Sequence, residues 1–127
     1  DRPVWVTFTC DENGRTLSGT DVLAALIVMQ GMGVDAFGLN CSSGPAEMLE
    51  QMRRLTPYTT VPLIAKPNAG LPETVEGQAV YHCPPEEFAS YAAGFAAALR
   101  RSMWPPCAPR WRRWISPPSS RPGGIPM

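Results

Sequence analysis

The chain has 127 residues, 44% of them hydrophobic, which is enough for one domain with an apolar core. No apolar run reaches the ~18 residues of a membrane-spanning helix, and the first ten residues alternate like a strand, so we expect a cytoplasmic protein without membrane contact. The formal net charge of zero hides a division, because residues 1–99 carry all 11 acidic residues and 5 basic ones, whereas residues 100–127 carry 6 arginines and no acid.

Residues 3–9 alternate apolar and polar side chains, as a strand does, and a polar turn with Asn13-Gly14 follows. Residues 20–33 predict a helix, with Thr20 as its cap and glycines at its end. Because residues 22–29 are apolar on nearly all sides, we expect this helix to be largely buried.

Two further strand–helix units follow. Residues 34–40 predict a short buried strand, and Pro45 opens a helix over 45–56 with Met48, Met52 and Leu55 on one face. Residues 61–65 predict a third strand. After a looser stretch, residues 84–99 predict a last helix, whose apolar stripe comprises Phe88, Tyr91, Ala92, Phe95 and Leu99.

Repeated strand–helix units indicate an α/β fold with a parallel sheet. An open doubly wound sheet and a closed (β/α)₈ barrel are both compatible with this order, and both place their chemistry beyond the carboxyl ends of the strands. Three groups of candidate residues stand at such ends: Thr9 with Cys10, Asn40 with Cys41, and Lys66 to Gly70.

Each candidate has a simpler interpretation. A cysteine is more often a small buried hydrophobe than a ligand, although a position beside a helix start, as for Cys41, favours the reactive thiolate. Asn68 stands on a proline-stiffened bend, where its amide suits the ammonium and carboxylate of an amino acid or simply forms a local turn. Lys66 could form a Schiff base or bind phosphate, but a strand-end lysine near solvent is the simpler interpretation. The only histidine, His82, lies in a loop and gives weak support to Ser/His/Asp catalysis.

Residues 100–127 hold 7 of the 15 prolines and 3 of the 4 tryptophans, without helical or strand periodicity. This basic tail could grip nucleic acid, could be a disordered end, or could be a translation of the wrong reading frame. The third interpretation is favoured, for the reason given below.

The segments "SGTDVLAALIVMQGMGVDAFGLNCSSGPAEMLEQMRRL" and "VPLIAKPNAGLPE" closely resemble the homocysteine S-methyltransferase family, and "PNAGLP" looks most like its cobalamin-dependent methionine synthases. The resemblance covers residues 3–99 and implies strands five to seven of a (β/α)₈ TIM barrel. It implies that Cys41 is one of three thiolate ligands to zinc. It also implies that Asn40 and Asn68 hold homocysteine, which receives a methyl group and becomes methionine.

The family's other two zinc ligands are adjacent cysteines in a Gly-Gly-Cys-Cys-Gly segment, where this chain has its tail. A frameshift near Leu99 would explain both the missing pair and the change of composition. We therefore expect a partial barrel domain over 1–99, an irregular tail over 100–127, an incomplete zinc site and no activity of the chain alone. The chain begins with Asp1 instead of Met, which also predicts a piece of a longer protein.

The same resemblance implies that the chain works with a methyl donor and with other protein modules. Methylcobalamin or another methyl donor is expected from a cobalamin or folate module of the parent protein or of a separate chain. An open half barrel leaves strand edges and apolar helix faces uncovered, which predicts self-association. The alternative function is a non-catalytic module whose basic aromatic tail contacts nucleic acid.

Overall fold

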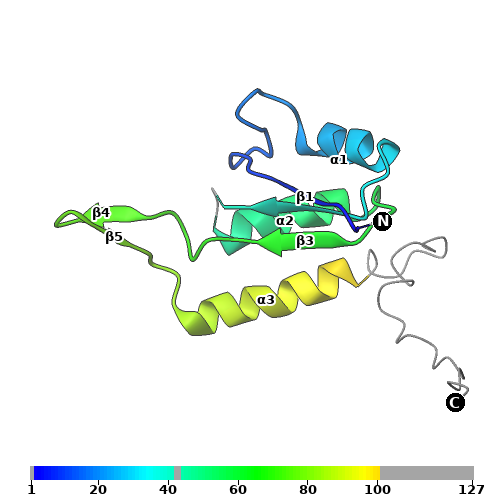
Figure 1. Ribbon diagram of the computed structural model, residues 1–127. Coiled ribbons are helices and arrows are strands. Elements are labelled where there is room, and N and C mark those ends of the chain that lie inside the picture. The colour runs from blue at the N-terminus through cyan, green and yellow to red at the C-terminus, as the bar shows by residue number, and fades with distance from the viewer. Residues whose placement is uncertain (1, 42–43, 101–127) are drawn as a thin grey trace, which may run out of the picture.

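The computed structural model describes residues 2–41 and 44–100. In that part of the chain, three parallel strands each lead towards a helix, and a small hairpin precedes the last helix (Figure 1). The elements in chain order are β1 (Trp5–Phe8), α1 (Val22–Gly31), β2 (Ala36–Asn40), α2 (Pro45–Leu55), β3 (Leu63–Lys66), β4 (Glu73–Val75), β5 (Gln78–Val80) and α3 (Pro85–Leu99). The predicted α/β class with parallel strand–helix units is confirmed.

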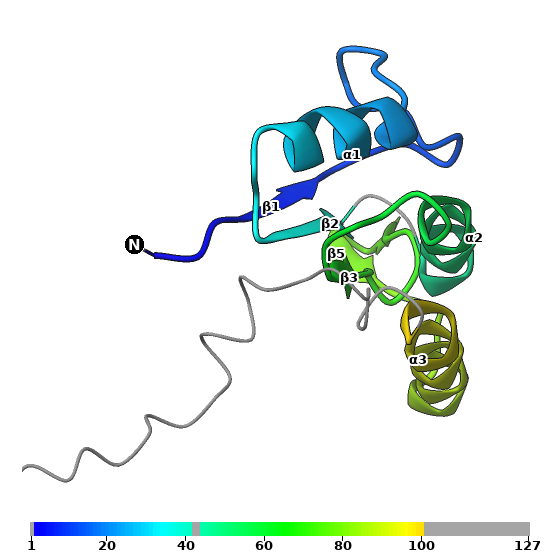
Figure 2. The ribbon, with the colours of Figure 1, turned by 90° about the vertical axis from the view of Figure 1, so that its right-hand side faces the viewer.

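Strands β1, β2 and β3 form one parallel sheet in which the strands are neighbours in chain order. The register places Thr7 beside Gly38, and Gly38 beside Ile64. Figure 2 shows the three helices along one side of the curved sheet. Because side chains alternate between the two faces of a strand, Thr7, Gly38 and Ile64 share the face that these helices do not cover.

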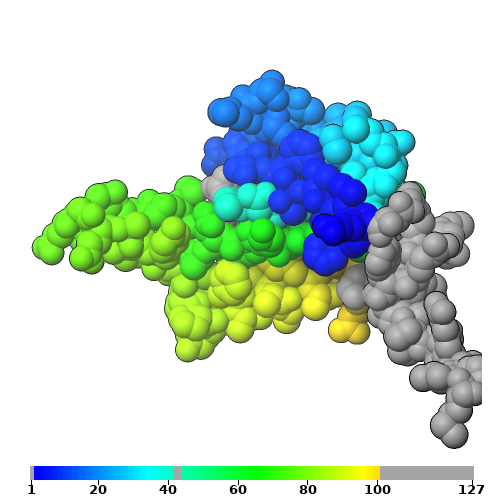
Figure 3. Space-filling view, viewed as in Figure 1, coloured from blue at the N-terminus to red at the C-terminus, as the bar shows by residue number. Residues whose placement is uncertain are grey.

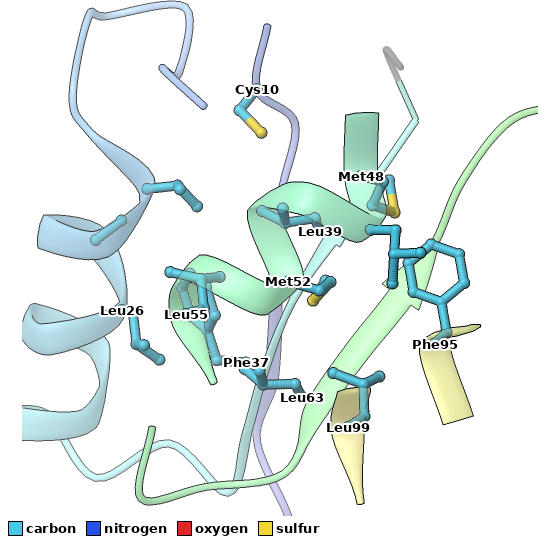
Figure 4. Packing of buried hydrophobic residues seen from close by; sticks show 13 residues of the cluster. Cys10, Leu26, Phe37, Leu39, Met48, Met52, Leu55, Leu63, Phe95 and Leu99 are labelled. Carbon is cyan, nitrogen blue, oxygen red and sulfur yellow. The ribbon is translucent and has the colours of Figure 1, made fainter. Parts of the chain in front are cut away.

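The core lies between the sheet and the helices (Figure 4). Phe37 and Leu39 of β2 are almost completely buried in it, and the rings of Phe8 and Phe37 lie 5.6 Å apart. Such burial stabilises the fold by ~1.5–3 kcal/mol for each large apolar side chain. Strand β3 adds Leu63 to this core. The helices contribute further large buried residues, which are Val22, Leu26, Met48, Leu49, Met52, Leu55, Phe95 and Leu99.

Helix α1 begins one residue later than predicted. Asp21, and not Thr20, is its N-cap, because the Asp21 carboxylate accepts a hydrogen bond of 2.9 Å from the backbone N–H of Leu23. Thr20 instead donates its own N–H to the Thr16 hydroxyl within the preceding loop. The end at glycine is as predicted, since Gly33 has a φ of 83° and its N–H bonds to the carbonyl of Gln30.

The prediction that α1 is largely buried is wrong for about half of its surface. Leu26 is fully buried, but Ile27 and Val28 are 51% and 55% exposed. The physical reason is the position of α1, which packs against the sheet through one stripe while no other described element covers its outer side (Figure 2). Because α1 is apolar on nearly all sides, its composition does not show which side is buried.

Helix α2 has the predicted start and buried face. Gly44 is its N-cap, Pro45 is its first residue, and Met48, Met52 and Leu55 are buried. Glu47 in the first turn and two arginines in the last turn complement the helix dipole.

Helix α3 packs on α2 through part of its predicted stripe. Phe95 and Leu99 are buried and Tyr91 is partly buried, but Ala92 is exposed. A carbon atom added to Gly94 would lie 3.0 Å from Leu49, so the two helices approach closely at this glycine. Ala92 lies outside that contact, which corrects its place in the predicted stripe.

The stretch before α3 is not merely a loose connection. Strands β4 and β5 pair in antiparallel fashion around a two-residue turn, Glu76-Gly77, with φ values of 51° and 80°. Such a turn matches the twist of a hairpin. Residues 71–82 are all exposed, and the hairpin projects from the body as an arm (Figure 3). Glu-Gly is a weak turn signal compared with Asn-Gly, which is why the sequence pattern did not reveal the hairpin.

No helix within the described residues has the length and apolar character needed to cross a membrane.

Candidate functional site

The carboxyl ends of the three parallel strands bring candidate side chains to one edge of the sheet. Asn40 ends β2 and pairs in register with Lys66, which ends β3. Thr9 directly follows β1. By the alternation of side chains, Asn40 and Lys66 share the face that carries Thr7, Gly38 and Ile64. The uncovered face of the sheet therefore ends in a row of polar residues.

The amide of Asn40 connects this row. Its Nδ2 donates a hydrogen bond of 3.0 Å to Oγ1 of Thr9 and another of 3.2 Å to Sγ of Cys41. The first bond ties β2 to β1, and the second holds the thiol next to the sheet edge. With both amide hydrogens engaged, the oxygen of Asn40 is the atom it can offer to a ligand.

Cys41 is exposed and has a left-handed backbone, with a φ of 57°. Its N–H donates to the carbonyl of Lys66 across the strand ends at 3.1 Å. A residue with a Cβ adopts this conformation at a cost of ~1–2 kcal/mol, and such strain is concentrated at functional sites. The thiol lies beside the amide of Asn40 at the strand end.

The bend that carries Asn68 is held from two sides. Gly70, with a φ of 97°, lies so close to Gly44 that a carbon added to Gly44 would be 3.3 Å from the Gly70 Cα. The N–H of Cys83 donates to the carbonyl of Ala69 at 3.1 Å. The side chain of Asn68 is half-buried and makes no hydrogen bond with another described residue. The structure thus joins Asn40 to Cys41, but it shows no bond between Asn68 and either of them.

Cys10 belongs to the core and not to this edge. It is 6% exposed and packs in the main apolar cluster. Burial and, secondarily, the charge of Asp11 raise the pKa of its thiol. The interpretation of Cys10 as a small buried hydrophobe therefore describes it better than a role as a ligand.

The remaining sulfur and imidazole groups lie elsewhere. Cys83 is half-buried at the base of the hairpin, and desolvation and the charge of Glu87 raise the pKa of its thiol. His82 forms an exposed pair with Glu73 at 3.0 Å. Cys107 and the whole segment 101–127, with the predicted nucleic-acid contact and the proposed frameshift, lie outside the described residues.

The residues present do not complete a metal centre. Within residues 2–41 and 44–100, no three His, Cys, Asp or Glu side chains lie close enough together to hold a metal ion. Zinc in a structural or catalytic site takes at least three protein ligands, and Cys41 offers one sulfur. Any zinc site that includes Cys41 must therefore draw at least one ligand from outside this part of the chain.

The close approach of Gly44 and Gly70 was missing from the sequence interpretation. These glycines permit the loop after β2 and the loop after β3 to touch at the site. The only sequence signal was their presence in "SSGP" and "NAGLP", which is equally compatible with ordinary turns.

The chain is similar in sequence to a known enzyme family. The sequence matches the family model for homocysteine S-methyltransferase over residues 1–104. It is 42% identical over 101 residues to the methionine synthase of Mycobacterium leprae (strain TN) and 41% identical over 101 residues to that of Mycobacterium tuberculosis (strain ATCC 25618 / H37Rv). Each match covers 80% of this chain and 8% of the relative, so the chain spans only a small part of these relatives.

Proposed function

Because the chain belongs to the homocysteine S-methyltransferase family, we propose that it is part of a domain that binds homocysteine as the acceptor of a methyl group. The parent protein would convert homocysteine to methionine. The observation that carries the proposal is the Asn40–Cys41 pair at the carboxyl edge of a parallel sheet, inside the matched region.

The proposed architecture is a segment of a (β/α)₈ barrel over residues 1–99. Two features support it: the strands are neighbours in chain order, and the helices lie along one side of the sheet (Figure 2). A doubly wound sheet would carry helices on both faces. In a barrel, the uncovered face of Thr7, Gly38 and Ile64 would point into the interior, and the row of polar residues would lie at its catalytic end.

Cys41 is proposed to supply one of the thiolate ligands of a zinc ion. Its exposure at the strand end supports this role. Because no three donor side chains lie together among the described residues, the ion needs at least one ligand from elsewhere. A methyl donor such as methylcobalamin would likewise come from another domain or chain. The chain alone is therefore proposed to be inactive.

Asn40 and Asn68 are proposed to bind the amino-acid end of homocysteine. Asn40 would accept from the ammonium group through its Oδ1, since its amide hydrogens are used by Thr9 and Cys41. Asn68 makes no hydrogen bond to a described residue, which leaves both its donors and its acceptor available.

A chimera tests the proposal. Residues 3–99 would replace the matching segment of the Mycobacterium leprae relative, and methionine formation and zinc content would be measured. We expect an active chimera that loses both activity and zinc affinity on Cys41→Ser, whereas the matched Cys83→Ser variant keeps both. Wild-type activity and zinc content in the Cys41→Ser chimera would rule out the assigned role.

The interpretation of the tail as a frameshift has its own test. The gene would be sequenced across the codons for Ala93 to Arg113 and translated in all three forward frames. A Gly-Gly-Cys-Cys-Gly segment in another frame would support a frameshifted remnant of a zinc methyltransferase. If no frame contains it, the tail is genuine, and salt-sensitive binding of nucleic acid becomes the function to measure.

A further inference from the structure

Lys66 is a cationic residue at the strand end beside Asn40 and Cys41. It ends β3 in register with Asn40, so its side chain leaves the same face of the sheet. Its carbonyl accepts the N–H of Cys41 at 3.1 Å, which makes the two residues direct neighbours across the strand ends. The side chain of Lys66 is exposed.

Other cations of the described residues are engaged or remote from this edge. Arg54 bonds to Asp21 at 2.7 Å, and Arg53 pairs with Glu50. Arg15 donates to the carbonyl of Gly19 within its own loop at 3.0 Å. Arg2 precedes β1 and Arg100 follows α3. Lys66 is in none of the ion pairs found in residues 2–41 and 44–100.

From this placement we infer that Lys66 receives the carboxylate of the amino-acid substrate while the substrate's sulfur lies at Cys41; the inference rests on the proposed function. Neighbouring strands lie ~4.8 Å apart, and the long lysine stem adds reach, so a small amino-acid thiol can bridge the two residues. Lys66 is thus a specificity-determining residue that selects a carboxylate-bearing thiol over a neutral one.

Charge makes such a cation necessary. Residues 1–99 hold 11 acidic residues against 5 basic ones, so the body of the chain repels an anion. Asp11, Glu12 and Glu47 belong to the segments that directly follow β1 and open α2, at the same end of the sheet. Asn40 and Asn68 offer only neutral amide groups, so neither of them neutralises the charge of the substrate's carboxylate.

Two small alkylating reagents test this inference on the full chain, without methyl transfer. The thiolate of Cys41 attacks the methylene carbon of iodoacetate or of iodoacetamide, the carbon–iodine bond breaks, iodide leaves, and a thioether forms. Iodoacetate carries a carboxylate close to the reacting carbon, whereas iodoacetamide is neutral. The rate ratio of the two, measured by peptide mass spectrometry, reports a cation placed beside the sulfur. Any change in the thiolate fraction affects both rates equally and cancels in the ratio.

We expect the iodoacetate-to-iodoacetamide ratio at Cys41 to fall about fivefold in Lys66→Gln, the effect of a unit charge ~4 Å away in water. Lys66→Arg should keep the ratio, and Arg15→Gln is the matched control that should leave it unchanged. Cys83, which lies near Glu87, is the internal reference and should show a lower ratio in every variant. High salt should lower the Cys41 ratio of the unmodified chain.

An unchanged Cys41 ratio in Lys66→Gln, or a ratio insensitive to salt, overturns the inference. This outcome is independent of the chimera experiment, because the alkylation needs neither zinc nor a methyl donor. A failed chimera with a Lys66-dependent ratio would reject the methyl-transfer function and keep the carboxylate site. An active chimera with an unchanged ratio would support the methyl-transfer function and reject the carboxylate site at Lys66.

Discussion

Gly38 of β2 and Ile64 of β3 face each other with no room for another carbon atom between them. A Cβ on Gly38 would lie 2.6 Å from the Cβ of Ile64 and would also collide with the Ile64 backbone. Any side chain larger than that of glycine at this position would force the two strands to shift.

Gly38→Ala should destabilise the fold by about 1–3 kcal/mol, the usual cost of forcing extra volume into packed structure. Urea unfolding measures the change. Gly31→Ala is the matched control, because a Cβ there meets nothing within 4 Å and alanine favours a helix by about 1 kcal/mol. Equal stabilities of the two variants would contradict the close approach of Gly38 and Ile64.

The left-handed conformation of Cys41 predicts an unusual order of stabilities. Glycine adopts a φ of 57° without steric cost, so Cys41→Gly should be about 0.5–1 kcal/mol more stable than Cys41→Ala, even after the larger chain entropy of glycine is counted. Thermal or urea unfolding of the two variants provides the comparison. A more stable alanine variant would show that the backbone at Cys41 is not strained.

The ion pair of Asp21 with Arg54 predicts a pH-dependent contribution to stability. The hydrogen bond from Arg54, then that from the Leu23 N–H, lowers the pKa of Asp21 below its ordinary value of 3.8. A lowered pKa in the folded state stabilises the fold above pH 3.8, and this contribution is lost as the pH falls through the folded value.

Arg54→Gln should therefore cost up to ~1 kcal/mol at pH 7, since the pair is partly exposed, and less at pH 2, where more of Asp21 is protonated. Arg53→Gln is the matched control, because its partner Glu50 lies 3.9 Å away and both side chains are exposed. Urea unfolding at the two pH values measures both variants. A loss that is the same at both pH values would exclude the ion pair as its cause.

Burial of Cys10 predicts that its thiol is protected. Its pKa is raised by burial and by Asp11, so at pH 8 it carries less thiolate than an ordinary cysteine. We expect iodoacetamide to label exposed Cys41 at least tenfold faster than Cys10 in the folded chain. The difference should largely disappear in denaturant, and persistent protection there would point to a cause other than folding.

The two sides of α1 predict opposite responses to substitution. Leu26→Ala should cost about 2–5 kcal/mol, because the side chain is fully buried. Val28→Glu should change stability by less than about 0.5 kcal/mol, because the side chain is 55% exposed. The predicted self-association of the chain can be measured by analytical ultracentrifugation. A lower association of Val28→Glu than of the unmodified chain would support a contact through the outer side of α1, whereas a monomeric unmodified chain would contradict the prediction.

Much of the fold could be predicted because strand and helix signals agreed with one another. The start of α2 at Pro45 and its buried face follow from proline at a first turn and from the spacing of Met48, Met52 and Leu55. The buried side of α1 could not be predicted, since its sequence is apolar all round and only packing decides which side is covered. The hairpin at Glu76-Gly77 could not be predicted because its strands have only three residues each and Glu-Gly is a weak turn signal.

The location of the candidate site could be predicted from the sequence, but its hydrogen bonds could not. The rule that parallel strands present functional groups at their carboxyl ends was sufficient to select Asn40 and Cys41. It could not reveal that the amide of Asn40 bonds both to Thr9 and to the thiol, because these contacts depend on the register and on the left-handed turn at Cys41. The different fates of Cys10 and Cys41 likewise depend on tertiary burial.

The hydrogen bond between Cys83 and Ala69 closes the hairpin arm at its base. This bond brings the bend after β3 next to the start of α3. Residues 70–82 therefore form an inserted loop between two neighbouring points of the chain. Such a loop can lengthen or shorten without moving the register of any parallel strand. A change in the length of this arm would therefore leave the strand ends of Asn40 and Lys66 in place.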